Sequence, residues 1–429
     1  MSGEGRETIF ALSSGQPPAA IAVVRISGLG ASGALVVLAG RVPEPRRTSL
    51  AQLRHPHSGE LLDQALLIWF PGPRTATGED LAELHLHGGR SVVAAVLEAL
   101  DGIDGLRRAE PGEFTRRAFA NGRIDLAEAE GLADLLAAET ETQRRAALSL
   151  AGGALSRKVE EWRGQVLELA AMLEAVIDFS DEGEVGEEFP SGWHENVAAL
   201  AAEIGALLRR PTVERLRDGI RVSIAGPPNV GKSSLLNVLV GREAAITSAV
   251  AGTTRDLVEA PIAIGGTPFL LIDTAGIRDS ADKVESIGVE RARASMDAAD
   301  LILWLGDVAE APDSRRTIAV SPKADLGTID PRADIAVSSL SGEGIDALVD
   351  ILIARARDLL PAAGDVAVNR RHRDLLADAV EQLNACGTDD LLIAAEALRH
   401  VRQLLDRITG RAGVEDMLDA LFGRFCIGK

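Results

Sequence analysis

The chain has 429 residues, enough for about three domains, and its hydrophobic share of 46% indicates folded domains with cores rather than a disordered polypeptide. An aromatic share of 3%, with no Tyr, argues against a nucleic-acid surface built from stacked aromatic rings. The formal net charge of −19 argues against a broad basic nucleic-acid surface; the arginine pairs at 144–145, 209–210 and 370–371 leave local contacts open, beside the more ordinary interpretation as solvated helix faces.

The ends and the cysteines of the chain carry little chemistry. Cys386 and Cys426 do not have the spacing of metal ligands, so neither a zinc site nor a disulfide framework is predicted. Residues 1–7 lack the basic and apolar regions of a signal peptide, and no apolar run approaches the ~18 residues of a membrane span. We therefore expect a cytoplasmic protein that has no membrane segment.

Residues 1–120 contain short apolar runs separated by turns with glycine or proline, a pattern that predicts one α+β domain. Strands are expected at 21–26, 64–70 and 81–87, and a helix at 91–100. A domain of this length is of ordinary size.

Residues 121–216 and 363–429 carry apolar side chains at helical spacing, and neither stretch can bury its apolar stripe alone. The residues between them, 217–362, alternate strand-like and helix-like segments, which is typical of a mostly parallel sheet covered by helices. We therefore predict an α/β domain at 217–362 that is inserted between the two halves of an all-α domain. Within it, strands are expected at 268–273, 301–305, 317–320 and 334–337, and helices at 286–299 and 345–359.

The most informative stretch is 226–233, Gly-Pro-Pro-Asn-Val-Gly-Lys-Ser, which follows a strand-like run and precedes a helix-like one. Glycine permits the tight turn in which backbone N–H groups surround a phosphate. In such a loop Lys232 would neutralise the β- and γ-phosphates of a nucleotide, and the Ser233 hydroxyl would ligate Mg²⁺. The sequence therefore predicts a nucleoside triphosphate site.

Two further motifs follow the phosphate loop. Asp-Thr-Ala-Gly at 273–276 ends a predicted strand, so Asp273 could hold Mg²⁺ through water and the Gly276 N–H could reach the γ-phosphate. Gly-Thr-Thr-Arg-Asp at 252–256 offers Thr254 as a hydroxyl that joins Mg²⁺ only when the γ-phosphate is present, although an ordinary turn is the other interpretation.

The base-selecting motif is incomplete. Where GTP-binding domains have Asn-Lys-x-Asp, residues 321–325 read Ser-Pro-Lys-Ala-Asp, so Lys323 and Asp325 are kept and Pro322 replaces the Asn. The Asp325 carboxylate can still accept from N1 and N2 of guanine, an arrangement that adenine does not offer. Because losing one polar contact costs ~1–3 kcal/mol, we expect GTP to bind with weakened affinity or selectivity. Residues 338–340 are a candidate for the last loop at the base.

Together, the motifs at 226–233, 252–256 and 273–276 resemble the bacterial Era-like translation-factor GTPases. The whole chain is similar to one family in particular, the MnmE (TrmE) family of tRNA uridine-modification GTPases. The segments that carry this resemblance are Thr8-Ile9-Phe10-Ala11, Val24-Arg25-Ile26-Ser27-Gly28, Phe70-Pro71-Gly72-Pro73, Thr77-Gly78-Glu79-Asp80, His87-Gly88-Gly89, Arg108-Ala109-Glu110-Pro111-Gly112-Glu113-Phe114-Thr115 and Phe425-Cys426-Ile427-Gly428-Lys429.

The resemblance implies a folate-binding-type N-terminal domain that also dimerises and that holds 5-formyltetrahydrofolate or a related one-carbon folate. The matching positions are Arg25, Glu83, Arg123 and the terminal Lys429. Taken by themselves, Arg25 and Glu83 are more simply a pair on neighbouring strands. Cys426 matches a functional thiol of the family, whereas from its sequence alone a buried structural cysteine is the more ordinary expectation.

The resemblance also bears on hydrolysis. Ile277 follows the Asp-Thr-Ala-Gly motif, so a Gln that orients the attacking water in Ras-like proteins is missing. The family implies that Asn229 binds K⁺ in place of an arginine finger. Ser248, Val250 and Thr253 are implied to complete the K⁺ shell when two G domains associate.

The expected nucleotide site therefore has three parts. The implied general base is Glu285, acting through a bridging water, although on composition it is equally a solvated carboxylate at a helix start. The Mg²⁺ ligands are Ser233 and Thr254. The residues expected to contact GTP are Asn229, Val230, Gly231, Lys232, Ser233, Ser234, Ser248, Thr253, Thr254, Asp273, Thr274, Ala275, Gly276, Lys323 and Asp325.

The expected function is a homodimeric, K⁺-stimulated GTPase that acts with an MnmG-type flavoprotein to add an aminomethyl-type group to C5 of the wobble uridine of tRNA. The expected parts are an N-terminal domain at 1–120, helical halves at 121–216 and 363–429, and a Ras-like G domain at 217–362. A GTP-dependent RNA or ribosome assembly switch without modification chemistry is one alternative, and a folate-dependent one-carbon transferase with a regulatory nucleotide site is another.

Overall fold

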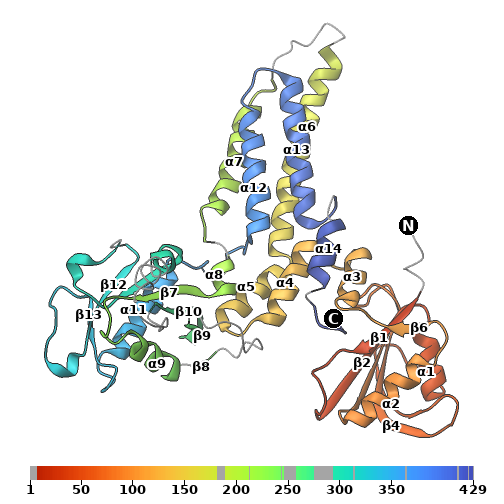
Figure 1. The fold of residues 1–429 in the computed structure, drawn as a ribbon. Helices are drawn as coiled ribbons and strands as arrows, with labels where there is room; N and C mark the ends of the chain where they lie inside the picture. The colour runs from red at the N-terminus through yellow and green to blue at the C-terminus, as the bar shows by residue number, and fades with distance from the viewer. Residues whose placement is uncertain are drawn as a thin grey trace, which may run out of the picture. The chain divides into compact units, whose positions relative to one another are not determined.

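The computed structural model describes residues 7–180, 189–211, 213–242, 244–245, 258–274, 293–312, 315–362, 365–412, 415–423 and 425–428. The chain forms two compact units (Figure 1). One consists of Met1–Ala133 with Asp406–Lys429, and the other of Asp134–Leu405. Each unit is described by itself.

The first unit is built on a six-stranded sheet with the strand order β3-β4-β5-β2-β1-β6. The strands are β1 (Thr8–Leu12), β2 (Ile21–Ser27), β3 (Thr48–Arg54), β4 (Leu61–Phe70), β5 (Leu81–His87) and β6 (Leu106–Arg108). The strands predicted at 21–26, 64–70 and 81–87 are confirmed as β2, β4 and β5. The sequence pattern had not predicted β1, β3 or β6, because β1 is buried at four of its five positions without alternation and β6 has only three residues.

Two helices cover one face of this sheet, α1 (Ala31–Ala39) and α2 (Arg90–Asp101) (Figure 1). The helix predicted at 91–100 is confirmed as α2. Its buried side chains recur at helical spacing and pack with the inward side chains of the strands into one core. The residues that α1 and α2 contribute to this core are Ala31, Ala34, Leu35, Leu38, Val93, Val96, Ala99 and Leu100.

The same unit contains the C-terminal end of the chain. Helix α3 (Glu113–Ala120) packs against α14 (Glu415–Phe422), and Phe422 and Phe425 share a core with Ala129 at the start of α4 (Leu126–Ala137). At Gly112, which has φ +69°, a Cβ atom would lie 2.3 Å from the carbonyl oxygen of Phe422. Only glycine therefore allows these two segments to approach so closely.

The C-terminal residues are tied to connecting segments of the first unit. Ile427 forms an isolated β-bridge with Pro111, and Ser13 Oγ donates a 2.8 Å hydrogen bond to the carbonyl oxygen of Gly428. The tail is thus placed by contacts with residues more than 300 positions away in sequence. Local pattern could not have predicted them.

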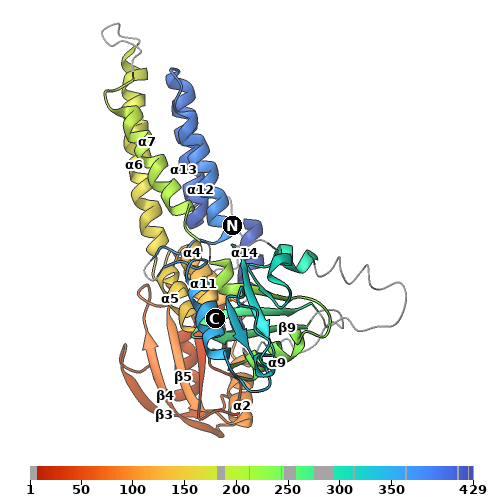
Figure 2. The ribbon, with the colours of Figure 1, turned by 90° about the vertical axis from the view of Figure 1, so that its left-hand side faces the viewer.

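Long helices form one part of the second unit (Figures 1 and 2). They are α5 (Glu141–Ala151), α6 (Ala154–Ser180), α7 (Trp193–Leu208), α12 (Arg370–Ala385) and α13 (Leu391–Thr409), which belongs to this unit up to Leu405. Helix α7 packs along α12 and against α6, and Trp193 Nε1 donates a 3.0 Å hydrogen bond to the carbonyl oxygen of Leu169. The break at Gly152 and Gly153 separates α5 from α6.

The other part is a seven-stranded sheet with the order β13-β12-β11-β7-β10-β9-β8, in which β8 and β9 are antiparallel to their neighbours. The strands are β7 (Ile220–Ala225), β8 (Ala244–Ala245), β9 (Val258–Ile264), β10 (Thr267–Asp273), β11 (Leu301–Trp304), β12 (Thr317–Pro322) and β13 (Ile335–Val337). The four strands predicted here are confirmed as β10 to β13. Strand β9 had not been predicted, and it contains Pro261, which argues against a strand when read alone.

Helices complete this part of the second unit. They are α8 (Glu214–Asp218), α9 (Lys232–Arg242) and α11 (Ile345–Arg357). The helix predicted at 345–359 is confirmed as α11. Of the helix predicted at 286–299, residues 293–298 are helical and 286–292 lie outside the described residues.

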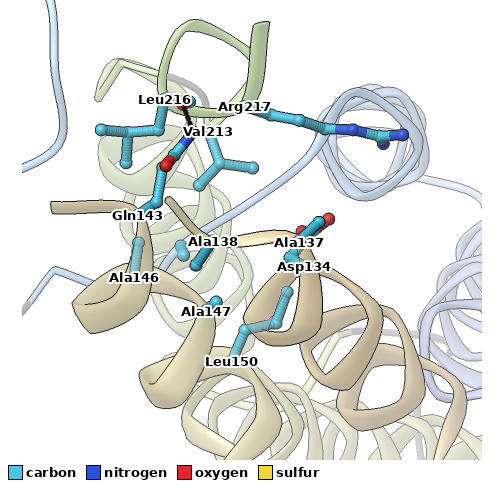
Figure 3. Close-up of a pocket in the computed structure, with 11 residues that line it drawn as sticks. Asp134, Ala137, Ala138, Gln143, Ala146, Ala147, Leu150, Val213, Leu216 and Arg217 are labelled. Atoms are coloured by element: carbon cyan, nitrogen blue, oxygen red, sulfur yellow. Dashed lines mark hydrogen bonds between the residues drawn. The ribbon is translucent and has the colours of Figure 1, made fainter. Parts of the chain in front are cut away.

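Helix α5 joins the helical and α/β parts of the second unit. Thr142 Oγ1 donates a 2.9 Å hydrogen bond to the carbonyl oxygen of Gly266, in the turn before β10, and Gln143 Nε2 donates one of 2.8 Å to that of Leu216 in α8. A small apolar cavity of about 70 Å³ lies beside these contacts (Figure 3). Figure 3 shows Ala147 and Leu150 of α5 on one side of it and Val213 on the other.

Candidate nucleotide-binding site

The phosphate loop lies between β7 and α9, as its flanking sequences predict. Strand β7 is buried, so the loop starts from a fixed point in the core. Gly226 has φ +143°, and a Cβ atom there would lie 2.9 Å from the Leu305 backbone. Asn229 and Gly231 also have positive φ, 60° and 112°. These left-handed residues give the loop its tight curvature.

Lys232 is the first residue of α9 and its side chain is turned back into the loop. It is 7% exposed, and its Nζ donates hydrogen bonds of 2.9 and 2.8 Å to the carbonyl oxygens of Gly226 and Pro227. Burial lowers the pKa of Lys232, and the negative charge of Asp273 opposes that shift. A phosphate bound in the loop could therefore replace these carbonyl oxygens as the hydrogen-bond partner of the ammonium group.

Ser233 and Asp273 meet beside the loop. Ser233 Oγ donates a 2.6 Å hydrogen bond to Asp273 Oδ2, and Asp273 is 2% exposed at the end of β10. Thr274, the next residue, donates through Oγ1 to the carbonyl oxygen of Ile224 at 2.8 Å, which fixes the end of β10 on β7. Two converging oxygen ligands suit a hard cation such as Mg²⁺. Among the described residues, no group of three or more His, Cys, Asp or Glu could hold a metal ion by itself.

A cavity of about 330 Å³ connects the loop with the base-side segments. Pro322 and Lys323 border it at the end of β12, followed by Asp325. Lys323 has φ 57°, and its Nζ donates a 3.3 Å hydrogen bond to the carbonyl oxygen of Asn229. The residues that line the cavity are Val230, Gly231, Ser234, Leu235, Leu305, Pro322, Lys323, Asp325, Leu326, Val337, Ser339 and Leu340.

Ser339 and Leu340 line the cavity, so the loop predicted at 338–340 does lie beside it. Leu305 and Leu326 were not among the candidates from sequence. Leu305 is buried next to β11, whereas Leu326 and Leu340 are 70% and 89% exposed. Exposed leucines beside a cavity indicate that the cavity can hold a ligand with an apolar face, such as a planar base. Only the tertiary structure shows that these leucines border the cavity.

Several predicted residues lie outside the described part of the chain. They are Ser248, Val250, Thr253, Thr254, Ala275, Gly276, Glu285 and Lys429.

The N-terminal candidates lie in the first unit. Arg25 on β2 and Glu83 on β5 are direct cross-strand partners and form an ion pair of 2.8 Å, as expected for two residues on neighbouring strands. Glu83 also lies 3.3 Å from His85 Nε2, and the Arg25 guanidinium lies over the Phe114 ring at 5.9 Å. Arg123 has a different contact, since its Nε donates to the carbonyl oxygen of Thr75 at 3.1 Å.

The two cysteines differ in their surroundings. Cys386 is buried, and burial raises the pKa of its thiol to about 11. Cys426 is exposed, so the expectation that it is a buried structural cysteine is wrong. A reactive thiol must be accessible, and of the two only Cys426 meets that condition. Within the described ranges, no helix combines the length and apolar character that crossing a bilayer requires.

Comparison with known proteins covers nearly the whole chain. The family model of the MnmE helical domain matches residues 126–426, and that of the GTP-binding protein TrmE N-terminus matches residues 8–123. A tRNA modification GTPase MnmE of Erythrobacter litoralis is 58% identical over 425 residues, which cover 99% of this chain and 100% of the relative. One of Novosphingobium aromaticivorans is 54% identical over 435 residues, with the same coverage.

Among solved structures, the G domain of the T. maritima FeoB iron transporter aligns with 32% of this chain and 98% of its own length, at 25% identity and a TM-score of 0.24. The two full-length relatives establish the family of the chain, because each is more than 50% identical to it over nearly its whole length. The chain belongs to the MnmE family of tRNA modification GTPases.

Proposed function

We propose that the chain hydrolyses GTP and, with an MnmG-type flavoprotein, adds an aminomethyl-type group to C5 of the wobble uridine of tRNA. The observation that carries the proposal is the single cavity that joins the phosphate loop to Lys323 and Asp325. One nucleotide in this cavity could reach both groups. The loop can hold its triphosphate, and the Asp325 carboxylate can accept hydrogen bonds from N1 and N2 of guanine. Family membership supplies the link to tRNA, and this substrate suits a cytoplasmic location.

The phosphate end of the proposed site fits a triphosphate with Mg²⁺. Lys232 would release the carbonyl oxygens of Gly226 and Pro227 and neutralise the β- and γ-phosphates. Ser233 would ligate Mg²⁺ directly and Asp273 through water, since the two already converge at 2.6 Å. Val230, Ser234 and Thr274 belong to the same proposed contact set. We assign Thr254, Ala275 and Gly276 to the remaining contacts on their motifs alone.

The hydrolysis step is proposed to depend on K⁺ and on association of two G domains in a homodimer. Asn229 is exposed on the phosphate loop, where it could contribute to a K⁺ site. Ser248, Val250 and Thr253 would complete the shell, and a cation there would offset charge that develops on the β–γ bridging oxygen. Glu285 would act as general base through a water molecule.

The N-terminal domain is proposed to bind a one-carbon folate such as 5-formyltetrahydrofolate. Arg25 and Glu83 form a partly exposed charged pair, with side chains 26% and 17% exposed, that could exchange one partner for a polar ligand. Arg123 and Lys429 join the proposal from the family motif. Cys426 is exposed in the tail and would be available as a functional thiol.

The proposed domain boundaries separate the folate-binding, helical and GTP-binding parts of the chain. We infer an N-terminal folate-binding-type and dimerisation domain at 1–120, helical halves at 121–216 and 363–429, and an inserted G domain at 217–362. Packing of α7 on α12 supports this arrangement, because the α/β part lies between those helices in sequence.

The proposal is tested by titrating the purified full chain with GTP, ITP and ATP in the presence of Mg²⁺. GTP should bind most tightly, ITP more weakly because it lacks the N2 amine, and ATP most weakly. Lys232→Ala serves as the control that removes phosphate binding in all three titrations. Equal affinities for GTP and ATP would refute the assignment of Asp325 as the residue that recognises guanine.

A GTP-dependent RNA or ribosome assembly switch is the second candidate, favoured only by the nucleotide site itself. It predicts that tRNA isolated after deletion of the gene keeps its normal uridine modification. Loss of the modification, restored by the intact gene, separates the two functions.

A further inference from the structure

Two connecting segments of the second unit, 209–218 and 365–374, lie side by side although about 150 residues separate them in sequence. The Val213 N–H donates a 3.2 Å hydrogen bond to the carbonyl oxygen of Val368. Arg210 Nη1 pairs with Asp365 Oδ1 at 2.6 Å, and Arg373 Nη1 donates to the carbonyl oxygen of Arg210 at 3.3 Å. The first segment is followed by β7, which leads into the phosphate loop, and the second contains the start of α12.

This contact gathers arginines that are far apart in the sequence. We call the group the arginine collar, and it consists of Arg209, Arg210, Arg217, Arg370, Arg371 and Arg373. Including Arg215, the two segments hold seven arginines against four carboxylates, in a chain whose net charge is −19. These two segments therefore carry a net positive charge, whereas the net charge of the whole protein is negative.

The collar divides into arginines whose guanidinium groups have a partner within the chain and arginines whose guanidinium groups have no carboxylate partner among the described residues. Arg210, Arg371 and Arg373 contact Asp365, His372 Nε2 and a backbone carbonyl, respectively. Arg209, Arg217 and Arg370 are exposed, and in the described part of the chain no carboxylate lies within ion-pair distance of their guanidinium groups. Figure 3 shows the Arg217 side chain extending away from α8.

Helix stability does not account for these positions. Arg370 and Arg371 occupy the first turn of α12, which contains no acidic residue. Cations are disfavoured at the positive end of a helix dipole, by about 0.3–1 kcal/mol each at exposed sites. The Glu214 carboxylate accepts a hydrogen bond from the Arg370 backbone N–H and supplies one negative charge at this end of α12. A bound anion would add a partner for the two guanidinium groups and offset the remaining unfavourable effect.

We propose that the arginine collar binds the phosphate backbone of tRNA. The inference rests on the proposed function for its RNA substrate, and it adds the place of contact. Guanidinium groups match phosphate oxygens in a bidentate manner, and the absence of aromatic residues from the collar segments in sequence points to backbone contact rather than base stacking. A contact of this kind is independent of sequence, so recognition of the uridine falls to other parts of the assembly.

The test compares the full-length triple variant R209Q/R217Q/R370Q with a matched control, R47Q/R332Q/R399Q, which removes three exposed arginines that have carboxylate partners. Binding of tRNA is followed by fluorescence anisotropy over a range of salt concentrations. Each lost phosphate contact reduces the magnitude of the negative slope of log K against log salt by about 0.7–0.9, so the slope of the triple variant should be shallower by about 2–3. The control should keep the wild-type slope.

Two further readouts separate the possible outcomes. The variant R209K/R217K/R370K keeps the charge and should retain most of the slope, whereas a merely structural role of the arginines would lower the thermal stability of the triple glutamine variant without changing the slope. Equal slopes for the triple variant and the wild type, or no salt-dependent binding by the wild type, would overturn the proposal.

A loss of flavoprotein binding with unchanged tRNA binding would also overturn the proposal and identify a protein interface instead. GTP hydrolysis measured on the same samples reports on the proposed enzyme function separately. If the wild-type chain lacks GTPase activity but its tRNA binding still shows a salt dependence that the triple variant weakens, the proposed enzyme function is refuted and the proposed RNA contact of the arginine collar is supported.

Discussion

Ser233 Oγ and Asp273 Oδ2 lie 2.6 Å apart, so the phosphate loop and the end of β10 are joined by one hydrogen bond at the proposed Mg²⁺ site. Ser233 lies at the start of α9, after the loop that follows β7, and Asp273 is the last residue of β10. Strands β7 and β10 are adjacent and parallel, and the residues of β7 from Ile220 to Ile224 pair in register with β10. The nucleotide site is thus preorganised by the sheet, because the strand pairing brings the hydroxyl and the carboxylate to the same edge.

The first prediction concerns this pair. Ser233→Ala removes the proposed direct Mg²⁺ ligand and should abolish most of the increase in GTP affinity that Mg²⁺ produces, measured by calorimetric titration in Mg²⁺ and in EDTA. Ser234→Ala, one position further along the exposed start of α9, is the matched control and should keep the Mg²⁺ effect. An undiminished Mg²⁺ effect in Ser233→Ala would remove Ser233 from the metal site.

The second prediction concerns the base end of the cavity. Pro322→Asn restores an amide at the position where Pro322 borders the cavity and should strengthen GTP binding by ~1–3 kcal/mol, or about 5- to 150-fold. Pro322→Ala gains the same backbone N–H as Pro322→Asn but no side-chain amide, and it should leave the affinity near that of the wild type. If both variants change affinity equally, the backbone at this position, rather than the missing amide, limits binding.

A third prediction concerns the hydrolysis step. Replacing K⁺ by Na⁺ should slow GTP hydrolysis strongly, and Asn229→Ala should remove the difference between the two salts. Glu285→Ala should slow single-turnover hydrolysis while GTP affinity stays unchanged. Equal rates in K⁺ and Na⁺ for the wild type would refute the K⁺ site, and unchanged hydrolysis in Glu285→Ala would refute its role as base.

The fourth prediction uses a charged network in the first unit. Burial of Glu113 opposes its ionisation, but hydrogen bonds from Arg107, the Glu110 N–H and Arg117 outweigh that effect, so its pKa lies below the ordinary value of 4.5. A carboxylate with a lowered pKa in the folded state stabilises the fold above about pH 4.5, and this stabilisation is lost as the pH falls through the folded-state pKa.

Glu113→Gln should therefore lower the free energy of unfolding at pH 7 by about 1–3 kcal/mol, and the difference from wild type should shrink below pH 4.5. Urea unfolding of the full chain at several pH values measures both effects. Glu60→Gln, at an exposed position of the same unit, is the control and should have little effect at any pH. A pH-independent difference for Glu113→Gln would show that packing, not charge, is lost.

The fifth prediction concerns the apolar cavity of about 70 Å³ beside α5 (Figure 3). Ala147→Val places two additional methyl carbons in that space and should leave stability unchanged or raise it by up to ~1 kcal/mol. Ala379→Val, at a completely buried position of α12, carries the same cost in helix propensity and should destabilise by ~1–3 kcal/mol through overpacking. Thermal unfolding distinguishes the two, and equal destabilisation would mean that the cavity cannot accept the added carbons.

Much of the local structure follows from the sequence. The phosphate loop with its flanking strand and helix, strands β2, β4, β5 and β10 to β13, and helices α2 and α11 depend on residues that are neighbours in the chain. Glycine at 226 and 231 and the apolar periodicity of the flanking segments carry that information without reference to distant residues. Strands β1 and β6 escaped prediction because a short strand gains its stability from its partner rather than from its own pattern.

The site as a whole was decided by tertiary structure. Lys323 contacts Asn229 across 94 positions of sequence, Ser233 meets Asp273 across 40, and Arg210 meets Asp365 across 155. The tail that carries the exposed Cys426 is held in the same way by the bridge between Ile427 and Pro111. Such contacts form only when separate segments pack on a common core, so sequence determined which groups are available and the packing decided which of them meet.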